Sequence, residues 1–301
     1  HIIQVRKCRF CIFMKKEKDA GMLLAVLFLV LPYLLTMIIS GRKACPLSRQ
    51  TDLEEYIPIL TAAHIDWGYE KEAIQAQTVI ERTNLSLKMK SEEAMKDIRE
   101  AADYLKKKSM SGEELKQFRR FQEAAVHTEG EVLVFQKEKR ELPYHPLSQG
   151  KTRSGEEILG EKFAYIPSVE TPKDIDSPLY VEGCYFSLKE LEEKIKKSYP
   201  AFSITAEAEI EITKTDSAGY VMEIQIGNQA FQGERIKEVL DLPSSCFSVQ
   251  SSQGEVRFLC KGIGHGMGMS QYTAHNLALE GKNYEQILGY FFPDMEIEKE
   301  K

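Results

Sequence analysis

The chain has 301 residues, of which 43% are hydrophobic and 29% charged, and its mean hydropathy is -0.34. This length fits one large domain or two small ones. The 11 Pro and 19 Gly exclude a collagen-like or low-complexity chain, and six Cys are too few for a disulfide-dense small scaffold. A formal net charge of -6 argues against a protein that binds nucleic acid through bulk charge.

The charge differs sharply between the two parts of the chain. Residues 1–50 hold nine Lys and Arg against two acidic residues, a net of +7, whereas residues 51–301 hold 31 against 44, a net of -13. Residues 20–40 form an uncharged apolar run of 21 residues, which is long enough to cross a bilayer as a helix. The run is longer than the apolar region of a cleaved signal peptide, the alternative, so we expect a membrane anchor.

The basic residues gather before the apolar run more than after it, which predicts a single-pass protein of the cell membrane with a cytoplasmic N-terminus. Residues 41–301 would then be extracytoplasmic. Met14 opens an ordinary signal-anchor sequence, so residues 1–13 are expected to lie upstream of the true start or to belong to a fragment boundary. The expected organisation is a basic tail at 1–19, the anchor at 20–40, a linker at 41–50, one domain at 51–297 and a tail at 298–301.

Periodicity, capping residues and helix breakers predict the elements of the domain in chain order. They are a helix at 52–63 opened by a Thr51-x-x-Glu54 capping box, a helix at 70–87, a charged helical stretch at 91–127, a strand at 132–135, a turn-rich loop at 143–155, an extended segment at 167–178, a helix at 187–198, strands at 204–213 and 220–226, a helix at 233–240, a strand at 255–261, and helices at 270–280 and 283–292. Helices come first and strands mix in later, which favours a single α+β domain.

The sharpest local motif is residues 261–271, Lys-Gly-Ile-Gly-His-Gly-Met-Gly-Met-Ser-Gln. In an extended conformation its alternate glycines would share one bare face, which a ligand or another chain segment could approach closely. We therefore expect a glycine-lined site before a helix capped by Ser270. The alternative is a structural strand-to-helix turn with a buried histidine. The candidate residues are His265, Gly266, Gly268, Ser270 and Gln271.

Continued to Tyr272, this motif resembles the closing signature of the stage II sporulation protein D family and its amidase-enhancer relatives. Residues 72–83, Glu-Ala-Ile-Gln-Ala-Gln-Thr-Val-Ile-Glu-Arg-Thr, resemble the family's opening signature. Between them, residues 148–152 resemble its Ser-x-Gly-Lys-Thr loop, and residues 165–174 resemble its Tyr-Leu-x-Ser-Val-x-Ser-Pro segment. These motifs stand in the family's order, which identifies the chain as a divergent member.

The resemblance implies a lytic transglycosylase that cleaves denuded peptidoglycan strands at the septum during engulfment. Its expected partners are the glycan strands and stage II sporulation proteins P and M, with no nucleic acid and no cofactor. An acid protonates the glycosidic oxygen, and the sugar's own 6-hydroxyl then closes a 1,6-anhydro ring. One carboxyl group can serve as acid and then base. The alternatives are an inactive glycan-binding or amidase-activating module and an envelope scaffold.

The family's acid is a Glu that precedes the first Glu of the opening signature by eight residues. Here that count runs from Glu72 back to His64. A carboxylic acid that loses its proton becomes an anion beside the developing cation, whereas an imidazolium becomes neutral, so its charge is wrong for this step. His64 is therefore a doubtful catalytic residue, with a structural role as the alternative, and Asp66 is the second candidate.

The resemblance also assigns binding roles outside the glycine motif. Arg82 would bind a carboxylate of the substrate bidentately, or else serve in an ion pair. The other expected binding residues are Tyr165, Ser148, Lys151 and Thr152, while Gln75 and Pro167 stand where Lys is usual. We expect no metal, because His145 is a single ligand near the Ser-x-Gly-Lys-Thr loop, where some relatives hold zinc, and that loop has no Cys.

Overall fold

The computed structural model describes residues 53–88, 91–108, 111–252 and 254–300, which fall in one compact unit, Leu53–Lys301. The expected basic tail, anchor at 20–40 and linker lie outside the described residues. Across the ranges that are described, no helix is both long and apolar enough to cross a membrane. The mixture of helices and small sheets confirms an α+β domain.

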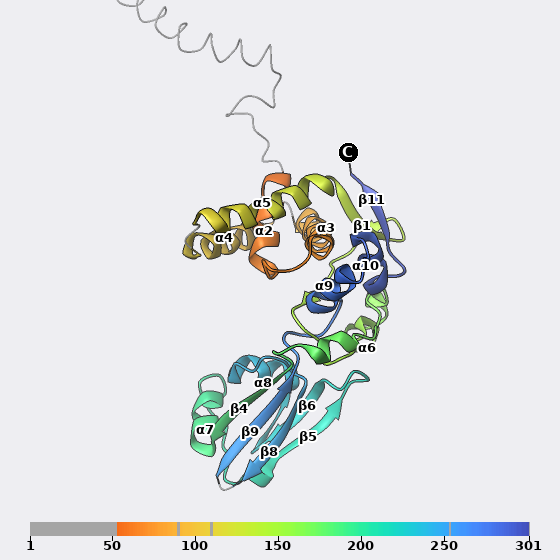
Figure 1. Ribbon diagram of the computed structural model, residues 1–301. Coiled ribbons are helices and arrows are strands. Elements are labelled where there is room, and N and C mark those ends of the chain that lie inside the picture. The colour runs from red at the N-terminus through yellow and green to blue at the C-terminus, as the bar shows by residue number, and fades with distance from the viewer. Residues whose placement is uncertain (1–52, 89–90, 109–110, 253, 301) are drawn as a thin grey trace, which may run out of the picture. The chain divides into compact units, whose positions relative to one another are not determined.

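The unit begins with helices (Figure 1). They are the 3-10 turn η2 (Leu53–Glu55), α2 (Ile57–His64), α3 (Lys71–Lys88), α4 (Glu92–Lys107) and α5 (Gly112–His127). The expected capping box starts at Thr51, which lies outside the described residues, and the Glu54 carboxylate accepts hydrogen bonds from Arg82. The charged stretch at 91–127 is two helices, since Ser111 begins a second one with its backbone N–H donating to Glu114 at 2.6 Å.

The described strands form four small sheets. Their orders are β11 (Glu296–Lys299), β1 (Glu131–Phe135) and β2 (Glu138–Lys139); β10 (Met269–Ser270) and β3 (Tyr144–His145); β4 (Val181–Ser187), β9 (Glu255–Lys261) and β8 (Phe247–Ser252); and β5 (Ile210–Thr215), β6 (Val221–Ile226) and β7 (Gln229–Gln232). The pair β3–β10 is parallel and the others are antiparallel.

The remaining described elements are short helices and turns. They are α6 (Gly155–Leu159), η3 (Glu161–Phe163), η4 (Pro172–Asp176), α7 (Leu188–Lys196), η5 (Glu207–Glu209), α8 (Gly233–Leu240), α9 (Gln271–Leu279) and α10 (Tyr284–Phe291). Two expected boundaries were wrong. The strand at 204–213 is replaced by η5 followed by β5, and residues 298–299 are not a free tail, because they pair with Val132 and Glu131 in β1.

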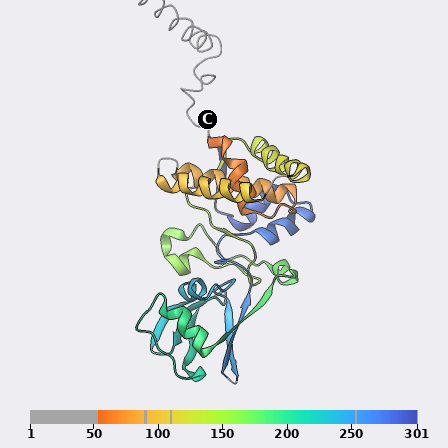
Figure 2. The same ribbon diagram turned by 90° about the vertical axis from the view of Figure 1, so that its left-hand side faces the viewer.

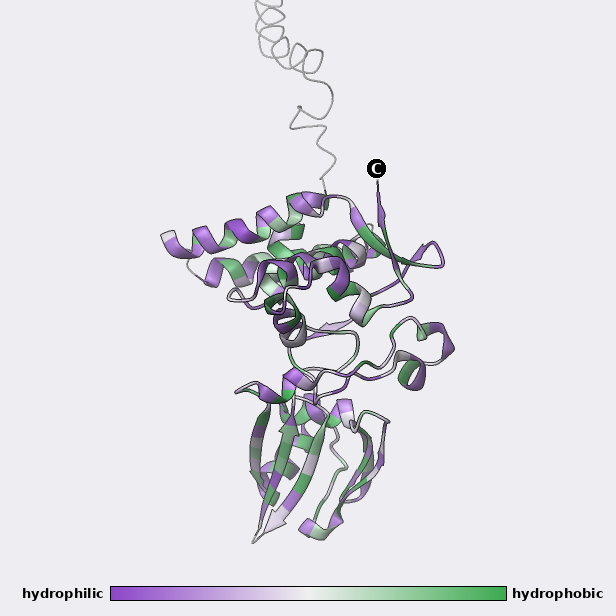
Figure 3. Cartoon of the chain, turned by 45° about the vertical axis from the view of Figure 1, so that its right-hand side comes forward, coloured by the Kyte–Doolittle hydropathy of each residue, from purple (hydrophilic) through white to green (hydrophobic). Residues whose placement is uncertain are grey.

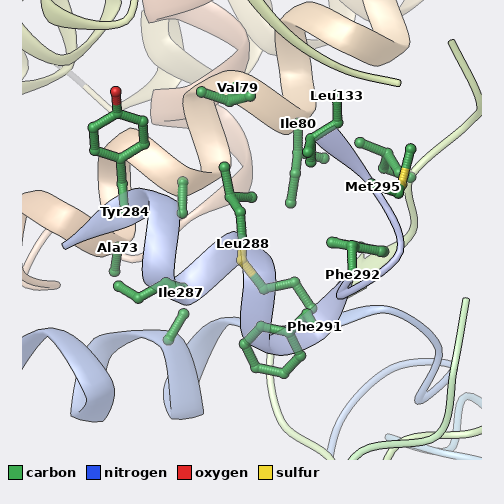
Figure 4. Packing of buried hydrophobic residues seen from close by; sticks show 14 of the residues in the cluster. Ala73, Val79, Ile80, Leu133, Tyr284, Ile287, Leu288, Phe291, Phe292 and Met295 are labelled. Atoms are coloured by element: carbon green, nitrogen blue, oxygen red, sulfur yellow. The ribbon is translucent and has the colours of Figure 1, made fainter. Parts of the chain in front are cut away.

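The helix α3 organises the core next to the site. It packs against β1 and against α9 and α10, which lie about 200 residues later in the chain (Figures 1 and 2). Figure 4 shows Val79 and Ile80 of α3 beside Leu133, Leu288 and other buried apolar side chains. A separate apolar cluster lies among β4–β9 and the helices α7 and α8. Buried α3 is therefore fixed in place, and so are the side chains it carries.

The helices α4 and α5 have two faces. Hydrophilic and hydrophobic residues alternate along them (Figure 3). In α4 the buried residues Ala94, Ile98, Ala101 and Leu105 recur every three or four positions, which is the spacing of one helix face. This face packs on α2, whose last residue is His64.

Candidate functional site

A cleft of about 370 Å³ lies where α2 ends. Side chains of α2, α3 and α4 line it together with residues 141–144 and one residue of the glycine motif. Its titratable or charged lining residues are His64, Glu81, Lys88, Asp97, Glu141, Tyr144 and His265. Two predicted site residues, His64 and His265, therefore share one cleft.

His64 makes an ion pair that the sequence did not reveal. Its Nδ1–H donates to Glu81 Oε1 at 2.9 Å, and the side chains are 35% and 6% exposed. Gln77 Nε2 donates to the same oxygen at 2.9 Å, and the Tyr144 hydroxyl also bonds the carboxylate. The signal for Glu81 was its position four residues after Gln77, which places both side chains on the same buried face of α3.

The pKa values of this pair move in opposite directions. Burial lowers the pKa of His64, but the hydrogen bond and charge of Glu81, with the charge of Asp97, outweigh it and raise that pKa above 6.5. Burial raises the pKa of Glu81, but bonds from His64, Tyr144 and Gln77 outweigh it and leave that pKa below 4.5. Each partner thus favours the charged form of the other.

Gln271 fixes the end of α2. From the first position of α9, its Nε2 donates to the His64 carbonyl at 2.7 Å and to Gln77 Oε1 at 3.0 Å. The closing motif and the opening helix, 194 positions apart between Gln77 and Gln271, therefore meet at the cleft. Gln271 positions His64 and is itself buried.

Asp66 points away from this arrangement. Its Oδ1 accepts the Gly68 N–H at 2.7 Å in a turn, and its side chain is exposed. It lines a second cavity of about 310 Å³, beside the stacked rings of Tyr69 and His275, whose centroids are 4.7 Å apart. The structure does not bring Asp66 into the cleft with His64.

Arg82 is buried in an internal ion pair. Its Nε and Nη2 donate to the two Glu54 oxygens at 2.6 and 2.9 Å. Its Nη1 donates to Thr128 Oγ1 and the Glu131 carbonyl, and its Nη2 to the Ala125 carbonyl, each at 3.2 Å. All five N–H groups of the guanidinium are taken by these partners, which leaves none for the expected substrate carboxylate. The alternative was an ion pair on the helix surface, and the structure has an ion pair that is buried.

The glycine motif is not an extended strand. Gly262, Gly264, Gly266 and Gly268 have φ values of 72°, 99°, 77° and 70°, which a side chain rarely adopts. A Cβ on Gly266 would overlap the Tyr220 ring, and one on Gly268 would overlap the Pro143 carbonyl. The bare backbone therefore admits other segments of this chain, and the expectation of one open glycine face was wrong.

His265 lies at the edge of the cleft and is largely withdrawn from water. Its Nδ1 accepts the Met267 N–H at 3.1 Å, and burial lowers its pKa to about 4. His145 is buried beneath it, 5.8 Å away between ring centroids, with its pKa lowered by burial to about 3. Both rings are neutral at neutral pH. Among the described residues, no group of three or more His, Cys, Asp or Glu could hold a metal ion.

The remaining predicted binding residues hold loops together. Asp174, which sequence reasoning missed, accepts the Ser148 N–H at 2.7 Å and hydroxyl bonds from Ser270 and Thr273 at 2.8 and 2.6 Å. Burial raises its pKa above 3.8, although these hydrogen bonds oppose the rise. Ser270 also caps α9, as expected, by accepting the Thr273 N–H.

Three further candidates lie outside the cleft lining. Thr152 Oγ1 accepts the Val169 N–H at 2.9 Å, and Tyr165 donates its hydroxyl to the Glu141 carbonyl at 2.9 Å. Lys151 forms an exposed pair with Glu170 at 3.5 Å. None of the three meets His64, so their predicted contact with substrate remains an expectation.

Comparisons with known proteins agree with the motifs. Residues 42–135 match the family model described as Stage II sporulation protein. Stage II sporulation protein D of Bacillus amyloliquefaciens is 26% identical over 257 residues, 81% of this chain and 74% of the relative. The protein of that name from Bacillus subtilis (strain 168) is 26% identical over 258 residues, with the same shares. An uncharacterized protein of Brachyspira hyodysenteriae is 23% identical over 270 residues, 89% of this chain and 70% of the relative. The expected resemblance is confirmed: this chain is similar to stage II sporulation protein D over 81% of its length.

Proposed function

We propose that this chain engages septal peptidoglycan during engulfment and cleaves denuded glycan strands as a lytic transglycosylase. The cleft carries the proposal, because His64 stands where the resemblance expects the acid and Glu81 supplies a carboxylate beside it. Relatives named stage II sporulation protein D support the sporulation part.

The proposal includes a place in the cell. Residues 20–40 anchor the chain in the cell membrane, the preceding residues lie in the cytoplasm, and the domain lies outside, where it meets glycan strands and stage II sporulation proteins P and M. Protease added to intact protoplasts should then remove the domain. A domain that survives until the cells are lysed would contradict this orientation.

The activity is tested on the purified full chain in a mild detergent, incubated with denuded glycan strands and analysed by mass spectrometry. We expect 1,6-anhydro ends that His64→Ala abolishes, while His127→Gln, at an exposed histidine at the end of α5, leaves them unchanged. If Asp66→Ala abolishes the activity and His64→Ala does not, the acid is Asp66, which lies outside the cleft.

The second candidate is a non-catalytic module that binds glycan or activates an amidase. The absence of a carboxyl group at position 64 favours it. If the protein binds glycan strands in a pull-down but leaves them uncut, only this second function would remain. No interaction with glycan would reject both candidates.

A further inference from the structure

We propose that His64 and Glu81 form one acid–base unit, in which His64 exchanges the proton with substrate and Glu81 supplies the negative charge that a lone imidazolium lacks. This inference rests on the proposed function and deepens it. It assigns the catalytic role to His64 and makes Glu81 a positioning residue that acts through it.

The geometry separates the two roles. Glu81 lines the cleft but is only 6% exposed, and its carboxylate already accepts hydrogen bonds from His64, Gln77 and Tyr144, so it is much less accessible to a substrate oxygen than His64 is. His64 is about a third exposed and lines the cleft. Because its Nδ1 is turned to Glu81, its Nε2 lies on the opposite edge of the ring, and no residue of the described ranges bonds that nitrogen.

The pair undergoes the charge change that the reaction needs. A protonated imidazole beside an ionised carboxylate is neutral in total, as a lone carboxylic acid is. After the proton leaves Nε2, the pair carries a charge of -1, again as the lone carboxylate would. The developing oxocarbenium centre therefore faces a net anion, which stabilises it. The sequence-based objection to histidine does not apply to the pair.

The proposed steps balance in atoms and charge. The Nε2 proton moves to the glycosidic oxygen, the bond between that oxygen and C1 breaks, and its electron pair stays on the leaving oxygen. The sugar's 6-hydroxyl oxygen then bonds C1, closing the anhydro ring, and its proton returns to Nε2. No water is consumed, and the His64–Glu81 pair ends in its starting state.

Neighbouring side chains hold His64 and Glu81 in position. Gln271 binds the His64 carbonyl, Gln77 links Gln271 to Glu81, and Tyr144 donates to the same carboxylate. The other groups that face the pair from packed elements are Asp97 on α4, Lys88 on α3, Glu141, and the neutral His265. Among these, Asp97 adds to the effect of Glu81 in keeping His64 protonated.

The test compares wild type, His64→Gln and Glu81→Gln as full chains, with Glu123→Gln on an exposed position of α5 as the matched control. We expect His64→Gln to lower the rate of anhydro-end formation about 10²–10⁴-fold, the usual contribution of a general acid–base group. Glu81→Gln should lower the rate and also shift the alkaline limb of the pH profile to lower pH. A purely structural role would not move that limb.

The direction of this shift follows from the negative charge of Glu81. Glu81 holds the His64 pKa above 6.5, so the acid form persists to higher pH, and removing the carboxylate leaves burial to lower the pKa. NMR titration of the His64 ring measures this directly and needs no activity. A His64 pKa at or below 6.5 in the wild type overturns the pairing even if Glu81→Gln fails to fold.

The outcomes separate the two proposals. If the wild type is active and Glu81→Gln has the same rate and pH profile, the acid–base unit is rejected while the transglycosylase proposal is kept. A wild type that forms no anhydro ends at any pH rejects the transglycosylase and, with it, the catalytic role of the pair.

Discussion

Replacing Arg82 by Met should destabilise the domain by about 3 kcal/mol. Removing one partner of a buried ion pair typically costs about 3–5 kcal/mol, because the other charge and its neighbours lose their compensation. The guanidinium is 2% exposed, but Glu54 is 25% exposed and can regain water, so we take the lower end of that range. Thr128 and two backbone carbonyls also lose their donor.

The matched control is Arg235→Met, which breaks the exposed pair between Arg235 and Glu238 and should change stability by less than about 1 kcal/mol. Urea unfolding of the full chain in detergent can be followed by fluorescence of the single, buried Trp67. A stability change below about 1 kcal/mol in Arg82→Met, together with lost glycan binding, would refute the structural role and restore the substrate-binding role.

Three further outcomes are expected. Gly268→Ala should destabilise by several kcal/mol in urea unfolding, because its Cβ meets a backbone carbonyl at positive φ, whereas Gly289→Ala on α10 has open space and should be neutral or stabilising by about 0.5–1 kcal/mol. The pKa of Asp174 is raised above 3.8 in the folded state, so just above pH 3.8 the folded state binds more protons than the unfolded state does. The contribution of Asp174 to stability therefore falls as pH rises through this range. The destabilisation caused by Asp174→Asn should accordingly shrink from pH 4 to pH 7. The double variant His64→Glu/Glu81→Gln keeps one carboxyl group in the cleft and should form anhydro ends faster than Glu81→Gln alone.

Local patterns predicted the elements that local interactions define. The helix expected at 70–87 is Lys71–Lys88, and the helix expected at 187–198 is α7, which a capping box of Ser187 and Glu190 begins. The strand β11 was missed because Glu-Ile-Glu-Lys is strongly charged and is ordered by pairing with β1, which no local pattern shows. The ion pair between Glu54 and Arg82 was missed for the same reason, since the two residues are 28 positions apart.

Part of the site could be predicted from the sequence. Counting back from Glu72 identified His64 as the residue in place of the usual acid, and the glycine motif identified His265 and Gln271. Glu81 lies within residues 72–83, which resemble the opening signature, yet its importance depends on how α2 packs against α3. The sequence alone does not show that Glu81, 17 residues after His64, supplies the carboxylate that position 64 lacks. This becomes visible only when α2 and α3 are placed side by side.

The charge around the cleft also bears on which glycan it accepts. Glu81, Asp97 and Glu141 stand against Lys88 and a protonated His64, a net of -1 at the cleft wall. Such a wall favours a developing cation and repels the carboxylates of peptide stems. Arg82, the residue expected to attract those carboxylates, is occupied by Glu54 in the interior. Under the proposed function, strands already stripped of their peptides are therefore the preferred substrate, and an amidase must act before this protein.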